Sequence, residues 1–135
     1  MLTKQPRISG WAILVVAMFS VPAFGQTPPQ ITETLKADLV GTQDQETVVQ
    51  VINFAPGTTL PWHLHPDGHE ILTLLEGKWS MEVEGRPSRE LKVGDTIYIE
   101  PNVVHRALND ASGPTKIQIV RIKPKSKAVS ENVKR

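Results

Sequence analysis

The sequence predicts one all-β domain, a sandwich or barrel built from short strands. Three observations support this prediction. The chain has 135 residues, which is enough for a single domain. Apolar and polar residues alternate over several short stretches, and this two-residue period is typical of a strand with one buried face. Eleven prolines and nine glycines supply turns between these stretches and disfavour long helices.

The expected strands lie between residues 46 and 122. The clearest is 78–84, where Trp79, Met81 and Val83 alternate with polar residues, so these three side chains should fill the barrel. The dipeptide Glu76-Gly77 is expected to form a hairpin turn to this strand, with glycine supplying a positive φ. The remaining strands are predicted at 46–54, 70–75, 91–93, 97–99 and 117–122.

The N-terminus has the pattern of a cleaved signal peptide at 1–25. Lys4 and Arg7 precede an apolar run at 11–19, and small residues at Ala23 and Gly25 form a cleavage site before Gln26. The alternative is a membrane anchor, but the run is well short of the roughly 20 residues that span a bilayer. The sequence therefore predicts an exported bacterial protein, periplasmic or secreted, with no stable membrane anchor after cleavage.

Three further segments follow the signal peptide. Residues 26–46 are predicted to be a linker and arm, 47–122 the barrel, and 123–135, with several lysines and few apolar residues, a flexible tail. The formal net charge is +1, so the strong basic field expected of a nucleic-acid-binding protein is missing. The chain has no cysteine, which excludes disulfides and thiolate ligands.

Three histidines and one glutamate form a candidate metal site. His63 and His65 are two residues apart, so on a strand they project to the same face. A turn at 66–68 can bring Glu70 back beside this pair, and His105 comes from a separate strand. Three imidazoles and a carboxylate suit one divalent Fe, Mn, Ni, Cu or Zn ion, whose identity the ligands do not reveal. A His-x-His pair alone would be weak evidence for any metal.

The residues around the first part of this set form a recognisable frame. Gly57 is followed by five residues, then His63-Leu-His65, four residues, Glu70, and six residues to Gly77. This spacing resembles the first motif of the cupin superfamily. Every anchor of that motif is present at a permitted spacing.

A second stretch resembles the second cupin motif. The spacings from Gly94 to His105 and from His105 to Asn109 match that motif. Two positions depart from it, because Glu100 stands where proline is common and Asn102 where glycine is usual. Asparagine is the next-best residue for a left-handed turn, so the second departure is mild.

The resemblance covers residues 47–122 and implies a cupin double-stranded β-helix, a jelly-roll barrel in one domain. It also implies that His63, His65, Glu70 and His105 are the four metal ligands, which leaves two positions of an octahedral ion open. A homodimer is expected by analogy with small cupins.

Other polar and aromatic residues near the motifs are expected to face away from the metal. Trp62 and Arg106 each neighbour a histidine ligand and so point to the opposite face. His69 should also face outward, unless it replaces Glu70 as the ligand. An outward, solvated Arg121 is favoured over an inward one that would bind a substrate carboxylate.

The fold does not fix the function. One hypothesis is a metal-dependent dioxygenase, resembling the small quercetin-dioxygenase-like cupins, that acts on a small enol or catechol-type molecule. Glu70 would then be the catalytic residue, serving as ligand and base. The alternative is a non-catalytic protein that binds a small ligand through its metal. A third possibility is a structural barrel with an empty site.

Overall fold

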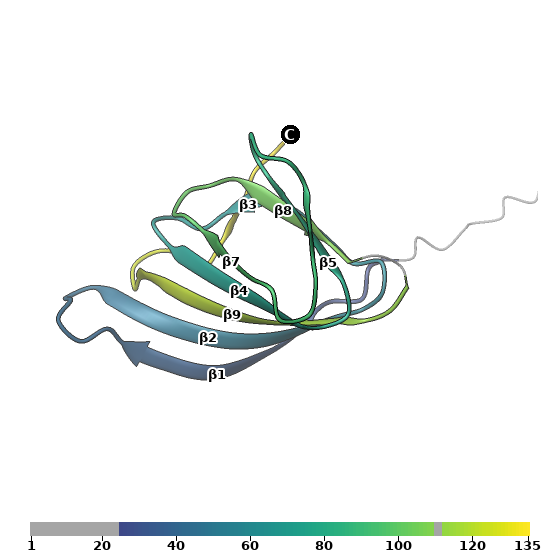
Figure 1. The fold of residues 1–135 in the computed structure, drawn as a ribbon. Coiled ribbons are helices and arrows are strands. Elements are labelled where there is room, and N and C mark those ends of the chain that lie inside the picture. The colour runs from purple at the N-terminus through teal and green to yellow at the C-terminus, as the bar shows by residue number, and fades with distance from the viewer. Residues whose placement is uncertain (1–24, 110–111) are drawn as a thin grey trace, which may run out of the picture.

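Two antiparallel sheets face each other in this protein (Figure 1). The computed structural model describes residues 25–109 and 112–135, and this part of the chain contains ten strands and no helix. Accordingly, no helix long and apolar enough to cross a membrane occurs in it. The predicted signal peptide lies outside the described residues, apart from Gly25.

The two sheets have five strands each. The first has the order β1 (Gln30–Asp38), β2 (Gln45–Phe54), β9 (Thr115–Pro124), β4 (His69–Glu76) and β7 (Thr96–Ile99). The second has the order β10 (Glu131–Asn132), β3 (Thr59–Leu64), β8 (His105–Leu108), β5 (Trp79–Val83) and β6 (Arg89–Leu91). From β3 to β9 the chain passes repeatedly from one sheet to the other. This topology confirms the predicted double-stranded β-helix.

The core lies between the sheets at the end of the barrel where β4 meets β5. Trp79, Leu74 and Ile117 are fully buried there, and the rings of Trp79 and Phe54 are 4.6 Å apart between centroids. Trp79 and Met81 fill the barrel as predicted from their alternation. Because apolar residues close this end, the polar inward-facing side chains gather toward the other.

The link between β4 and β5 differs from the prediction. Residues 76–77 were expected to close a hairpin, but β4 and β5 belong to different sheets, so the chain crosses the barrel here. The positive φ expected at Gly77 is present, at 84°. A Cβ at this position would lie 2.4 Å from the carbonyl oxygen of Pro114, so the crossing requires glycine.

Two asparagines of the second motif, Asn102 and Asn109, stabilise turns and contacts between strands of the barrel. Asn102 has a φ of 64°, the left-handed turn for which it was expected to replace glycine. Asn109 is buried, and its side-chain amide donates hydrogen bonds to the carbonyl oxygens of Ala55 and Gly113. Its oxygen accepts a hydrogen bond from Thr115. Asn109 therefore ties β8 to β2 and β9.

Both ends of the described chain are paired with the barrel. The predicted arm contains β1, which pairs with β2 along its length although all its residues are exposed. The predicted tail at 123–135 contains the end of β9, which runs to Pro124, and β10, which pairs with β3. The backbone N–H of Val133 also donates to the carbonyl oxygen of Trp62, 2.8 Å away. A segment predicted to be a flexible tail thus contains strand residues, and the sequence does not indicate this because backbone pairing and charged side chains leave no apolar pattern.

Candidate metal centre

Two neighbouring strands bring the three histidines together. His63 lies on β3, His65 follows directly after this strand, and His105 begins β8. In the pairing of β3 with β8, His63 is the partner of His105. One ring nitrogen from each histidine lies within 4.8 Å of the others. The convergence expected from the spacing of these residues is therefore present.

The outer nitrogen of each imidazole is held by the backbone. Each Nδ1 lies within hydrogen-bond distance of a carbonyl oxygen, which can only accept, so Nδ1 carries the proton. The distances are 2.8 Å from His63 to Pro61, 2.6 Å from His65 to Val129, and 2.9 Å from His105 to Val103. Each Nε2 is then left with a lone pair, and this is the arrangement found around metal-binding histidines.

Two of the three inner nitrogens are buried without a hydrogen-bond partner. Nε2 of His65 and Nε2 of His105 are buried and form no hydrogen bond with any described residue. Buried polar atoms in folded proteins are nearly always satisfied, so two unpaired lone pairs in one cluster call for an explanation. A transition-metal ion bound at this cluster would supply one.

Glu70 on β4 lies beside the histidines. One of its carboxylate oxygens, Oε2, is 2.9 Å from Nε2 of His65, and Oε1 is 4.0 Å from Nε2 of His105. Without a metal, a proton on Nε2 of His65 can bridge these two atoms, and a metal ion can take the place of that proton. Two ligands at about 2.1 Å from a metal, at a right angle, are about 3.0 Å apart. The residues present therefore fit a metal ion.

Arg121 contradicts its predicted outward orientation. It is 9% exposed, and its Nε and Nη2 lie 3.1 and 2.9 Å from Oε2 of Glu70. Its Nη1 donates to the side-chain oxygen of Gln50, 2.8 Å away. Arg121 shares the inward face of β9 with Ile117 and Ile119. The alternation of residues along this strand therefore predicts an inward Arg121, which is the orientation observed. Gln50 gave no comparable signal, because a single glutamine on a strand is usually solvated.

The protonation states at the cluster suit metal binding. Burial alone would raise the pKa of Glu70, but the contact with His65 and the charge of Arg121 outweigh it and lower the pKa to about 2. Burial lowers the pKa of His63 to about 4 and also lowers the pKa of His105. At neutral pH the site therefore offers an ionised carboxylate at Glu70 and neutral imidazoles at His63 and His105, the forms that bind metals.

The neighbours of the ligands face outward, as predicted. Nδ1 of His69 is 2.7 Å from the hydroxyl oxygen of Tyr98, on the outer face of the sheet opposite Glu70. His69 therefore does not replace Glu70. Trp62 packs against two guanidinium groups, with Arg106 at 5.0 Å and Arg135 at 4.4 Å from its ring centroid.

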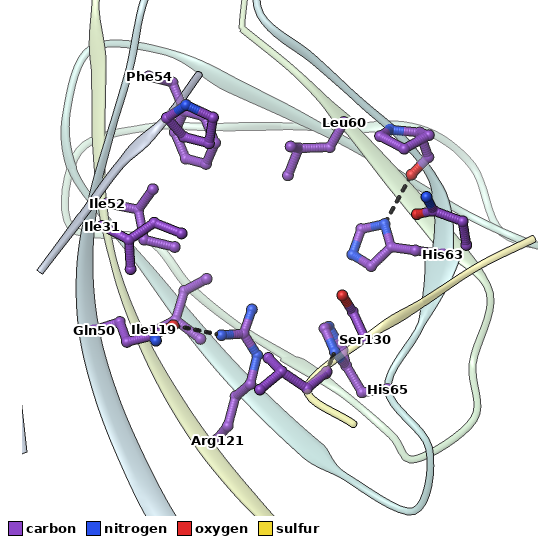
Figure 2. A pocket seen from close by; sticks show the side chains of 14 residues that line it. Ile31, Gln50, Ile52, Phe54, Leu60, His63, His65, Ile119, Arg121 and Ser130 are labelled. Atoms are coloured by element: carbon purple, nitrogen blue, oxygen red, sulfur yellow. Dashed lines mark hydrogen bonds between the residues drawn. The ribbon is translucent and has the colours of Figure 1, made fainter. Parts of the chain in front are cut away.

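A cavity of about 380 Å³ opens beside the cluster (Figure 2). His63 and His65 line one side of it, and the guanidinium of Arg121 lies between Gln50 and His65. Most of the other wall residues are apolar, namely Pro29, Ile31, Ile52, Phe54, Leu60, Pro61, Ile119 and Val129. Glu70 and His105 line a second space of about 20 Å³, which also touches His63 and Arg121. The cavity is therefore an apolar chamber whose polar side chains, two imidazoles, a guanidinium and the Gln50 amide, lie close to the candidate metal site.

The sequence of residues 50–121 matches the family described as Cupin domain. This stretch covers more than half of the chain and includes His63, His65, Glu70 and His105. The chain belongs to the cupin domain family. A curated relative, the uncharacterized protein YdbB of Bacillus subtilis, is 36% identical over 45 residues, which are 33% of this chain and 40% of that protein.

Solved structures show the same fold. An uncharacterized conserved protein with a double-stranded β-helix domain from Klebsiella pneumoniae is 25% identical, with a TM-score of 0.61, over 89% of this chain and 99% of that one. A cupin-like protein from Thermotoga maritima is 31% identical, with a TM-score of 0.58, over 78% and 75% of the two chains. The DMSP lyase DddQ from Ruegeria pomeroyi is 24% identical with a TM-score of 0.56, and this chain covers 67% of its own length but only 44% of the lyase. At that identity the likeness concerns the fold alone.

Proposed function

We propose that this chain binds one divalent Fe, Mn, Ni, Cu or Zn ion with His63, His65, His105 and Glu70, and acts as a dioxygenase on a small enol or catechol-type molecule. The observation that supports the metal most directly is the pair of buried, unpaired Nε2 atoms of His65 and His105. A bound ion would supply Lewis acidity and, if redox-active, electrons for the chemistry of O₂.

The residues around the ion would have distinct tasks. The hydrogen bonds at Nδ1 fix the orientation of each imidazole and keep its lone pair directed inward. The apolar walls of the cavity limit the water that reaches a bound substrate. Glu70 is held ionised by Arg121, which suits a ligand.

The role of Glu70 as catalytic base has less support than its role as ligand. A carboxylate with a pKa of about 2 is a weak proton acceptor at neutral pH, because general bases work best with a pKa near the operating pH. This observation favours the alternative function, a non-catalytic protein that binds a small ligand through its metal. The two functions differ in turnover alone, so turnover is the quantity to measure.

The first experiment is metal analysis of untagged protein purified from its native host. The second is oxygen uptake by protein loaded in turn with Fe, Mn, Ni or Cu, in the presence of flavonols, catechols or 1,3-diketones. Uptake that matches product formation, and that disappears in His105→Ala, would support the dioxygenase. Ligand-induced changes in the spectrum of the metal without oxygen uptake would support the binding protein. If the protein purified from its native host contained no metal, both functions would be contradicted.

We further propose that the protein is exported from a bacterial cell and pairs as a homodimer. The support for export is the sequence pattern at 1–25. Exposed Ile31 and Leu35 on the edge strand β1 supply apolar surface that a second subunit could cover. N-terminal sequencing of periplasmic material should find Gln26 as the first residue, and light scattering should give twice the mass of one chain.

A further inference from the structure

Arg121 places a positive charge in the cavity, beside the histidines. We propose that the ligand of this cavity is an organic anion, whose carboxylate binds Arg121 and whose apolar body fills the chamber. The proposal rests on the proposed function, because it places this ligand in the cavity next to the metal. It goes further by naming the charge and shape of the ligand and the residue that selects them.

The guanidinium of Arg121 has donors to spare. Its three polar contacts use Nε, one N–H of Nη1 and one N–H of Nη2. An arginine has five N–H groups, so two remain, one on each terminal nitrogen, without a partner among the described residues. Figure 2 shows the guanidinium directed into the chamber, between Gln50 and His65. A free N–H on each terminal nitrogen allows the guanidinium to donate to the oxygens of a carboxylate.

The arginine is also fixed in place before a ligand arrives. Its side chain is 10% exposed, Glu70 holds one edge of the guanidinium, and Gln50 holds a terminal nitrogen. A fixed and partly desolvated cation loses little conformational entropy when it binds an anion. A flexible surface arginine would have neither advantage.

The charge balance of the site favours an anion. Arg121 and Glu70 neutralise each other. Glu46 pairs with the buried Lys123 at 3.0 Å and with Lys36 at 3.3 Å, so that this group leaves no carboxylate unpaired. A bound divalent ion would therefore add an uncompensated charge of about +2 to a largely apolar chamber, which is costly without an anionic partner.

The apolar walls determine the rest of the ligand. Ile52, Phe54 and Leu60 surround the chamber on the side away from Arg121 (Figure 2). A volume of about 380 Å³ lies at the small end of ligand-binding cavities. These features fit a carboxylate attached to one aromatic ring or a short branched chain.

The test uses full-length protein loaded with Co²⁺, whose visible spectrum reports on ligands near the metal. Phenylacetate and the neutral amide phenylacetamide have nearly the same shape, so their dissociation constants compare an anion with a neutral molecule. We expect phenylacetate to bind at least about tenfold more tightly, as a charge-assisted pair of hydrogen bonds requires. Arg121→Met should abolish this preference.

Two controls make the result interpretable. Arg106→Met removes an arginine from the outer face, where it pairs with Glu82, and so repeats the change in net charge away from the cavity. It should keep the preference for phenylacetate. Because Arg121 also contacts Glu70, the Co²⁺ affinity of Arg121→Met is measured first, and the titrations are done at saturating Co²⁺.

Equal binding of the acid and the amide by the unaltered protein would overturn the proposal. So would a preference that persists in Arg121→Met, because the carboxylate would then bind the metal alone. Failure of Co²⁺ to bind at all would instead overturn the proposed metal site. Absence of oxygen uptake would overturn the dioxygenase and leave the preference for anions intact.

Discussion

The carbonyl groups at Nδ1 decide how the three imidazoles behave. Each fixes a proton on the outer nitrogen and directs the inner nitrogen into the cluster, and the buried Nε2 of His105 has no hydrogen-bond partner there, which is costly in a metal-free protein. His105 is the most buried of the three, at 1% exposed. The cluster is therefore built for a cation at the expense of stability without one.

His105→Ala should weaken the binding of Zn²⁺ or Co²⁺ by more than about 100-fold. Removing only the hydrogen-bond partner of a metal ligand commonly lowers metal affinity by about 10- to 100-fold, and this variant removes the ligand itself. Titration against a chelator of known affinity measures the loss. His69→Ala is the matched control, since His69 contacts Tyr98 on the outer face. If His69→Ala emptied the site and Glu70→Ala did not, the assignment of Glu70 as a ligand would be wrong by one residue.

Among elements, the C-terminal segment has a larger role than its composition indicates. The carbonyl oxygen of Val129 accepts the hydrogen bond from His65, and β10 pairs with β3 at His63 and Leu64. Val129, Ser130 and Asn132 also line the cavity. Residues after β9 thus hold one candidate ligand and form part of the chamber wall.

Val133→Pro should weaken metal binding by about tenfold, a typical effect of losing an outer partner of a ligand. Proline lacks the N–H that donates to the carbonyl oxygen of Trp62, so the segment loses an anchor and the hydrogen bond from His65 to the carbonyl oxygen of Val129 loosens. Chelator titration measures the affinity. Val133→Ala keeps the N–H and should bind metal like the unaltered protein; equal affinities for both variants would show that the segment does not support the site.

The crossing from β4 to β5 is a second element whose geometry depends on one residue. Gly77→Ala should lower the free energy of unfolding by about 2 kcal/mol or more, since it combines a positive φ with a clash against Pro114. Gly85→Ala is the control, with a φ of 72° but open space around its Cβ, and should cost only about 1 kcal/mol. Urea unfolding measures both. Equal losses would place the cost in the backbone angle alone.

At the scale of the whole molecule, much of the fold could be predicted from local patterns. Alternation identified β2, β4, β5, β7 and β9 and placed Trp79 and Met81 inside, and the motif spacing anticipated the histidine cluster. No bounds were predicted for β1, β3 or β8. Which sheet a strand joins is not a local property, so the glycine turn at 76–77 was interpreted as a hairpin. Backbone pairing leaves no side-chain pattern, and for this reason β10 was missed. Arg121 was misplaced because a charged residue is usually solvated, and its partner Glu70 lies 51 residues away.

The stability of the metal-free protein should depend on pH through the buried histidines. The pKa of His63 is lowered by burial from 6.5 to about 4 in the folded state, while the unfolded chain keeps the ordinary value. Between these two values the unfolded state binds a proton that the folded state does not. Stability is therefore complete above about pH 6.5 and declines as the pH falls toward 4.

Urea unfolding in the presence of a chelator, at half-unit steps from pH 7.5 to 4.5, measures this decline in stability with falling pH. His63 and His105 are the two histidines whose pKa values burial lowers, and His63→Gln keeps only His105. The stability of this variant should therefore fall less steeply with pH than that of the unaltered protein. Identical slopes would mean that protonation of His63 is not coupled to unfolding and that its imidazole is more accessible to water than its position on β3 indicates.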